Sequence, residues 1–171
     1  GAWLKFAGLD FIIIEGKASK PVYLYVEKGR EELRSAGELW GKDTVETQEA
    51  LARRYGPRVR AACIGPAGER AVRYSAIVSG RRTASRGGVG TVMGAKNLKA
   101  VVVNAPESGV ELHDPAAFKK LVRAELDSFK ATGEAFEIFH RYGTVTPELF
   151  NTMGIFPVRN FQYGDMDGID Q

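Results

Sequence analysis

At residues 98–104 the chain reads Leu98-Lys99-Ala100-Val101-Val102-Val103-Asn104, a mostly apolar stretch that decides the fold class. Its consecutive β-branched valines favour a strand, and its low polarity indicates that the strand is buried. The run is far shorter than the ~20 apolar residues that cross a bilayer. The start of the chain also lacks a signal-peptide pattern. We therefore expect a sheet-containing domain with no membrane contact.

Further strands are predicted upstream of this stretch. Residues 10–15 and 22–26 are rich in β-branched and aromatic side chains, and we expect them to form a hairpin across the turn at 16–20. The other strands are predicted at residues 32–34, 59–64 and 72–78. Together with the strand at 98–104, they predict a sheet-rich block.

Two helices accompany these strands. Residues 3–7 have the pattern of a helix end, and Gly8 is its expected left-handed stop. Asp43 is followed three residues later by Glu46, which is the spacing of a capping box. The second helix should therefore run from there to about Tyr55, where Gly56 and Pro57 end it.

The composition changes at residues 104–109, where we place a boundary between a domain at 1–106 and a domain at 107–171. Beyond it the pattern is helical, because Asp114 is a good cap and Pro115 suits the first helical position. Two more helices are predicted, at residues 135–142 and from Thr146 to a stop at Gly154. The fold class is therefore α+β: a sheet-rich N-terminal domain, followed by the start of an all-α domain.

Positive charge is concentrated in one part of the chain. No Asp or Glu occurs between Arg70 and Pro106, whereas residues 107–171 hold 11 acidic and 6 basic residues. The basic residues of the acid-free stretch are Arg70, Arg73, Arg81, Arg82, Arg86, Lys96 and Lys99. Such an imbalance predicts an anionic ligand.

The bend at residues 80–90 combines arginines with Gly87, Gly88 and Gly90. Glycines let the backbone approach a ligand closely, and the guanidinium group of arginine is suited to phosphate. However, the spacing matches neither the dinucleotide fingerprint nor the phosphate-binding P-loop. From the residues alone, the bend could hold an anion or could be a structural turn with solvated arginines.

The residues that often bind metals are sparse. Cys63 is the sole cysteine and lies in an apolar stretch, so we expect a buried, inert side chain and a reducing, cytoplasmic setting. His113 precedes a helix cap and is interpreted as a surface residue, and His140 lies near a helix end. No metal centre is predicted from these side chains.

Several spaced motifs nevertheless resemble the N-terminal domain of the tungsten-containing aldehyde:ferredoxin oxidoreductase family. The similarity runs over nearly the whole chain and keeps the motifs in order. They are Cys63-Ile64-Gly65-Pro66-Ala67-Gly68-Glu69, residues 82–90, and Val92-Met93-Gly94-Ala95-Lys96-Asn97-Leu98-Lys99-Ala100, with further matches at Glu15-Gly16-Lys17-Ala18 and Pro157-Val158-Arg159-Asn160-Phe161.

The resemblance implies an oxidoreductase that converts an aldehyde to a carboxylate with oxygen from water. It implies a tungsten bis-pterin cofactor (tungstopterin), whose phosphates share a magnesium ion, and a [4Fe-4S] cluster that passes electrons to ferredoxin. The N-terminal domain would form the base for the pterins. A homo-oligomer, or an electron-transfer subunit of a larger complex, is also implied.

For the site itself, the resemblance points to residues 82–88. Arg82 would hydrogen-bond a pterin or its phosphate, and the backbone carbonyl of Thr83 would face the magnesium. The residues that would shape the bend are Ala84, Ser85, Arg86, Gly87 and Gly88. Ser85 replaces a glycine that is usual in the family, and Thr83 a common alanine. No residue is predicted to be catalytic, because the cluster cysteines and the aldehyde pocket are expected outside residues 1–171.

Two alternatives remain at this stage. One is the tungsten subunit of a related low-potential enzyme that reduces aromatic rings or oxidises 2-oxo acids, since the substrate pocket lies elsewhere. The other is a module that binds anions or nucleic acid through the basic bend. The basic stretch offers only Tyr74 for base stacking, so no nucleic-acid partner is expected.

Overall fold

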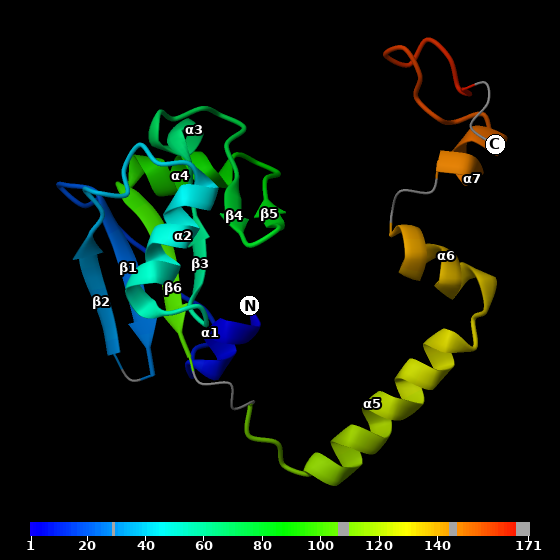
Figure 1. Cartoon of the computed structure of the whole chain (residues 1–171), viewed down its shortest axis with the longest axis horizontal. Coiled ribbons are helices and arrows are strands. Elements are labelled where there is room, and N and C mark those ends of the chain that lie inside the picture. The colour runs from blue at the N-terminus through cyan, green and yellow to red at the C-terminus, as the bar shows by residue number, and fades with distance from the viewer. Residues whose placement is uncertain (29, 106–109, 144–146, 167–171) are drawn as a thin grey trace. The chain divides into compact units, whose positions relative to one another are not determined.

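The computed structural model describes residues 1–28, 30–105, 110–143 and 147–166, and divides them into two compact units (Figure 1). The first unit is Gly1–Val110 and the second is Glu111–Gln171. The boundary predicted between residues 106 and 107 falls outside the described residues, so it stays a prediction.

The first unit contains one mixed sheet of six strands. They are β1 (Val22–Glu27), β2 (Arg30–Ser35), β3 (Arg60–Cys63), β4 (Ile77–Ser79), β5 (Arg82–Ala84) and β6 (Leu98–Asn104), in the order β2-β1-β6-β3-β4-β5. The predicted strand at 98–104 is confirmed as β6, a central strand. It is parallel to β1 and antiparallel to β3, and all the other pairs are antiparallel.

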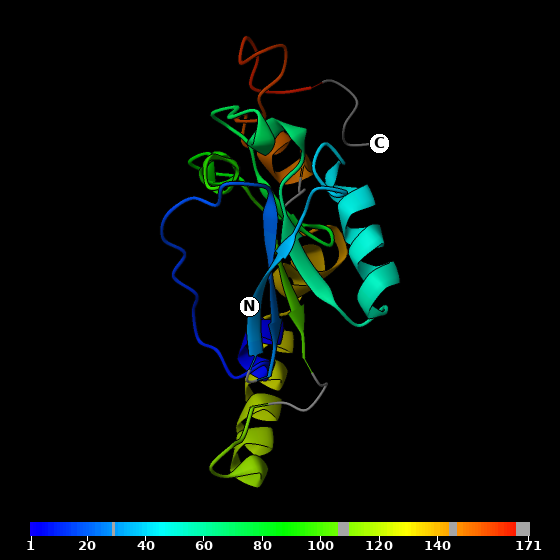
Figure 2. The same ribbon diagram turned by 90° about the vertical axis from the view of Figure 1, so that its left-hand side faces the viewer.

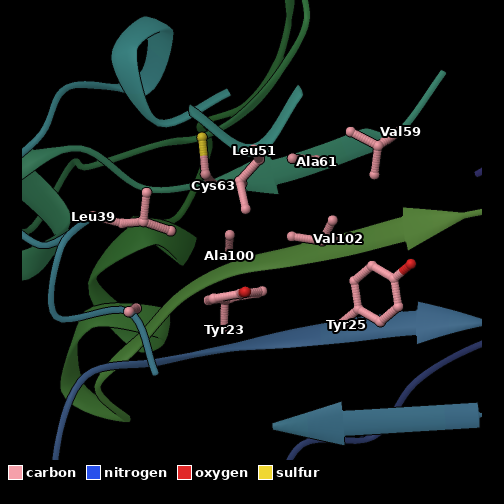
Figure 3. Close-up of a cluster of buried hydrophobic side chains, with 10 residues drawn as sticks. Tyr23, Tyr25, Leu39, Leu51, Val59, Ala61, Cys63, Ala100 and Val102 are labelled. Carbon is pink, nitrogen blue, oxygen red and sulfur yellow. The ribbon is translucent and has the colours of Figure 1, made fainter. Parts of the chain in front are cut away.

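Each face of the sheet is covered by a different part of the chain (Figure 2). The helix α2 (Thr44–Tyr55) covers one face, where Leu51 meets Tyr23, Ala100 and Val102 in the main core (Figure 3). The short helix α1 (Ala2–Phe6) and the extended segment after it cover the other face, and contact Val26 and Val103. Because successive strand residues point to opposite faces, the unbroken valine run supplies both cores.

The predicted capping box is confirmed at the start of α2. One carboxylate oxygen of Asp43 accepts from the N–H groups of Val45 and Glu46, both at 2.8 Å, and Glu46 accepts from the Asp43 N–H at 3.0 Å. The helix ends at Tyr55, before Gly56 with a φ of +94°. Gly8 likewise has a φ of +89° after α1, in agreement with its predicted role as a stop.

The strand predicted at residues 10–15 is wrong, and so is its hairpin with residues 22–26. Ile12 and Ile14 pack against the sheet, but Phe11 and Ile13 are 72% and 74% exposed, and the segment joins no ladder. The physical reason is that β1 already pairs with β2 on one side and β6 on the other, so it has no free edge.

The strand predicted at residues 72–78 is wrong for all but its last part, which belongs to β4. Residues 72–75 form a turn instead, in which the Ser75 N–H donates to the Val72 carbonyl at 3.0 Å and Tyr74 is exposed. These local hydrogen bonds occupy the backbone groups that a ladder would need. Two helices flank this region: α3 (Pro66–Glu69) and α4 (Val89–Ala95).

The second unit is helical, as predicted. It contains α5 (Pro115–Lys130), α6 (Glu134–Tyr142) and α7 (Pro147–Thr152), followed by an isolated bridge between Val158 and Tyr163. The Asp114 carboxylate caps α5 by accepting from Ala116 and Ala117, at 3.0 and 2.9 Å. Within the described ranges, every helix is too short or too polar to cross a membrane.

Cys63 is fully buried beneath α2, and its thiol faces the Thr44 carbonyl at 3.6 Å. Burial raises the pKa of this thiol from its ordinary value near 9 to about 11. Thiolate, the reactive form, is therefore scarce at neutral pH, and the prediction of a buried side chain is confirmed.

Candidate functional site

The basic bend connects the edge of the sheet to a helix. The loop predicted at residues 80–90 is wrong in two places: residues 82–84 form the edge strand β5, and α4 begins at Val89. The turn between β4 and β5 consists of Gly80 and Arg81. Gly80 has a φ of +58° and Arg81 a negative one, which is the type II′ pattern of a two-residue hairpin. Residues 85–88 connect β5 to α4, which follows them at once (Figure 1).

The backbone of Thr83 is available to a ligand. In a two-residue hairpin, the residues that flank the turn form a hydrogen-bonded pair, and the next pair along the ladder does not. Here Ser79 and Arg82 flank the turn, and Val78 and Thr83 form the next pair. The N–H and C=O groups of Thr83 therefore point to the outer edge of β5, which pairs with no further strand among the described residues.

The arginines of the bend are exposed and carry uncompensated charge. All the predicted site residues from Arg82 to Gly87 are exposed, and only Gly88 is buried. Among the described residues, neither Arg82 nor Arg86 has an ion pair or a hydrogen bond with another side chain. A planar cation held at the surface without a protein partner is suited to an anionic ligand.

The glycines of this region serve two different purposes. Gly87 has a φ of +84° and no atom within 4 Å of the position that a Cβ would take, so its backbone is open to a ligand. By contrast, a Cβ on Gly88 would lie 1.9 Å from the Arg73 carbonyl oxygen, and one on Gly90 would lie 2.6 Å from that of Ala76. Gly88 and Gly90 therefore allow the chain to pack against residues 73–76.

Gly94 has a similar role between the two short helices. A Cβ at this position would lie 1.9 Å from the Gly68 carbonyl oxygen, so α3 and α4 touch backbone to backbone. We expect Gly94→Ala to separate these helices and to cost about 3 kcal/mol, the upper end for overpacking, because a backbone obstacle cannot change rotamer. Hydrogen exchange of the α3 and α4 amides measures this cost.

Gly37→Ala is the matched control for that substitution. Its Cβ would meet only the Ser35 hydroxyl oxygen, at an ordinary 3.8 Å, and Gly37 does not have a positive φ. Equal exchange rates in the Gly94 and Gly37 variants would contradict the proposed backbone contact.

Of the seven basic residues, Lys99 does not contribute to the surface charge that the sequence indicated, and Lys96 keeps its charge but is bonded to another segment of the chain. Lys99 is fully buried, forms an ion pair with Glu69 of α3 and donates to the Lys42 carbonyl at 2.7 Å. Lys96 donates to the Gly16 carbonyl at 3.0 Å. The positive surface at the bend therefore depends on its arginines.

The structure also identifies residues near the bend that no sequence pattern indicated. Gln48 of α2 accepts from the Gly80 N–H at 2.6 Å, and so fixes the tip of the β4–β5 hairpin. Ser75 and Thr91 form a hydrogen-bonded pair at 2.8 Å beside the first turn of α4. These residues lie 32 and 16 positions apart in sequence from their partners, and no local pattern predicts such contacts.

The histidines do not form a metal site in the part of the chain that the structure describes. His113 and His140 are exposed, and His140 stacks on Phe136 with ring centroids 5.5 Å apart. Within the same ranges, no group of three or more His, Cys, Asp and Glu side chains could hold a metal ion. The donors that remain are guanidinium groups and backbone groups, and this set fits the phosphate end of an organic cofactor.

Comparisons with known proteins find relatives of this chain. A family model described as aldehyde ferredoxin oxidoreductase, N-terminal domain, matches residues 1–105. A tungsten-containing aldehyde ferredoxin oxidoreductase of Pyrococcus abyssi is 47% identical over 167 residues, which are 96% of this chain and 27% of that protein. The chain thus spans about a quarter of the length of this relative.

Two further relatives carry different names. The WOR-like subunit of an aliphatic sulfonate oxidoreductase from Pyrococcus furiosus is 36% identical over 137 residues, covering 72% of this chain and 22% of that protein. In three dimensions, a chain of the active site complex BamBC of benzoyl coenzyme A reductase, in complex with 1,5 dienoyl-CoA, superposes with a TM-score of 0.71 and 43% identity. The match covers 75% of this chain and 20% of that chain.

Proposed function

The chain belongs to the aldehyde ferredoxin oxidoreductase family, and on that premise we propose that residues 82–88 bind the phosphate end of a tungsten bis-pterin cofactor. One observation carries the proposal: Arg82 and Arg86 are exposed and lack protein partners among the described residues, beside the open backbone of Gly87. Two uncompensated guanidinium groups next to an open backbone can offset the charge of phosphate groups.

Each residue of the bend has a specific role in this proposal. The Arg82 guanidinium would donate hydrogen bonds to a phosphate or to a pterin ring. The Thr83 carbonyl, on the outer edge of β5, would face a magnesium ion that neutralises the phosphates. Ala84 and Ser85 set the course of the chain, Arg86 adds a second cation, and Gly87 and Gly88 supply the positive φ angles of 84° and 68°.

The bend would also influence the electronic properties of the cofactor. When bound, the tungsten centre would supply the oxidation of an aldehyde to a carboxylate, with oxygen from water. The positive charge of Arg82 and Arg86 lowers the electrostatic cost of holding anionic phosphates and dithiolenes, and therefore affects both retention and redox potential. We propose that the [4Fe-4S] ligands, the aldehyde pocket and the ferredoxin contact belong to other parts of the longer enzyme.

The proposal is tested on the full-length protein that contains this segment. We expect tungsten and pterin to co-purify with it, with two pterins for each tungsten, and we expect aldehydes to reduce ferredoxin in its presence. Elemental analysis, pterin quantification and a ferredoxin-reduction assay check these expectations. A protein that folds but contains neither tungsten nor molybdenum after expression with both metals would contradict them.

A second candidate function is a different low-potential reaction on the same cofactor base. It is favoured by the TM-score of 0.71 and the 43% identity to a chain of the benzoyl coenzyme A reductase complex, over 75% of this chain. Aldehyde-dependent ferredoxin reduction supports the first function, whereas turnover only with aromatic thioesters or 2-oxo acids supports the second. Salt-dependent oligonucleotide binding by the metal-loaded protein would instead favour the nucleic-acid alternative.

A further inference from the structure

A hydrogen-bonded pair of hydroxyl groups, from the buried Ser75 and the half-buried Thr91, lies next to the bend. Thr91, in the first turn of α4, donates a hydrogen bond to the Val72 carbonyl. Its hydroxyl oxygen lies 2.8 Å from that of Ser75, which is 4% exposed. Because a hydroxyl has one proton and Thr91 gives its own to Val72, the Ser75 hydroxyl is the donor in the second bond. Both hydroxyl protons are therefore used within the protein, and neither is available to a ligand.

The same place is fixed by backbone contacts. The Gly90 N–H donates to the Ser75 carbonyl at 3.1 Å, and the Thr91 N–H donates to the Gly88 carbonyl at 3.0 Å. Gly88 itself lies so close to the Arg73 carbonyl that it has no room for a side chain. The turn at residues 72–75 thus contacts Gly88 at the end of the bend, and Gly90 and Thr91 at the start of α4.

These contacts determine where the bend ends. Only residues 85–88 separate β5 from α4, so a shift of the first turn of α4 moves the bend with it. The other end is fixed by the β4–β5 ladder, whose tip is bonded to Gln48. Between these two ends, residues 85–88 have one hydrogen bond of their own, from the Gly88 N–H to the Ser85 carbonyl at 3.4 Å. The bend therefore keeps its shape largely through the elements at its two ends.

We propose that Thr91 and Ser75 are positioning residues that hold the bend in its cofactor-binding geometry. This inference rests on the proposed function of residues 82–88 and adds a specific role for two residues outside that range. Partners that orient ligand-holding groups typically affect metal affinity about 10- to 100-fold. Loss of the Thr91 hydroxyl should accordingly lower the amount of retained cofactor in a protein that still folds.

The test uses the full-length enzyme with Thr91→Val, which keeps the β-branched shape and removes the hydroxyl, and Thr91→Ser, which keeps the hydroxyl. We expect Thr91→Val to lower the tungsten and pterin content per protein about 10-fold or more, and Thr91→Ser to stay near the wild-type value. Ser75→Ala leaves the hydrogen bond from Thr91 to Val72 in place and should cause a smaller loss of tungsten and pterin. This second variant tests the proposal if Thr91→Val does not fold.

Thr47→Val is the matched control, since the fully buried Thr47 hydroxyl donates to the Asp43 carbonyl at 2.6 Å in α2 and does not contact the bend. We expect it to lower the unfolding midpoint and to leave tungsten content and the W(V) paramagnetic resonance spectrum unchanged. Equal cofactor loss in the Thr47 and Thr91 variants, or wild-type content in both Thr91→Val and Ser75→Ala, would overturn the inference. If Arg82→Ala still loses cofactor in that case, the proposed function of residues 82–88 stands although the inference about Thr91 and Ser75 fails.

Discussion

Arg82→Ala in the full-length enzyme should strongly lower the amounts of tungsten and pterin that co-purify with the protein. Arg82 is exposed on the edge strand β5 and has no protein partner among the described residues, so its removal leaves the fold unchanged. A charge-assisted, bidentate contact with phosphate contributes about 1.5–3 kcal/mol, which corresponds to roughly 10- to 100-fold in retention. Metal and pterin analysis of the purified variants measures the effect.

Two further variants separate the causes of that loss. Arg82→Lys keeps the charge but not the planar pair of donors, so we expect an intermediate cofactor content. Arg58→Ala removes one exposed positive charge at a position outside the bend, and should leave the cofactor content unchanged. An unchanged metal-to-protein ratio in Arg82→Ala would count against the role of the bend.

Lys99→Met should destabilise the first unit by about 3–5 kcal/mol, the usual cost of breaking a buried ion pair by removing one partner. Lys99 is fully buried and pairs with Glu69, whose side chain is 5% exposed and also accepts from the Gly41 N–H at 2.9 and 3.1 Å. Without the ammonium group, the carboxylate and the Lys42 carbonyl both lose a buried donor. Hydrogen exchange of the β3 and β6 amides in the full-length protein measures the loss.

The chain offers an exposed ion pair as the control. Arg53→Met removes the i,i+4 pair between Arg53 and Glu49, whose side chains are 72% and 62% exposed, and should cost less than about 0.5 kcal/mol. Adding Glu69→Gln to Lys99→Met removes the buried charge but keeps an acceptor for Gly41, so it should recover part of the stability. A double variant less stable than Lys99→Met alone would contradict this account of the ion pair.

The sequence predicted the elements whose signals are local. Asp43 and Glu46 form the capping box that starts α2, Asp114 and Pro115 start α5, and the valine run forms β6. The strand predicted at residues 10–15 has an equally strong β-branched signal, but strand pairing depends on a free neighbour. The order of all the strands in the sheet decides whether β1 has a free edge, so a local sequence pattern cannot predict it.

The exposure of the bend could be predicted from the sequence, but the contacts around it could not. The arginines and Gly87 face solvent, as a ligand-binding bend requires. The sequence pattern of the bend did not distinguish the open Gly87 from Gly88 and Gly90, which allow close packing. It also assigned Lys99 to the positive surface, although Lys99 is buried and paired with Glu69. These distinctions depend on contacts between residues far apart in sequence. The roles of residues 82–88 toward a cofactor remain predictions.

The most direct test of the central claim is an experimental structure of the full-length enzyme with its cofactor bound. We predict that the Arg82 guanidinium lies about 3 Å from a pterin or phosphate acceptor. We also predict that the Thr83 carbonyl oxygen lies about 2.1 Å from a magnesium ion between the phosphates. A cofactor whose phosphates are held by other residues, with Arg82 and Thr83 facing solvent, would contradict the claim.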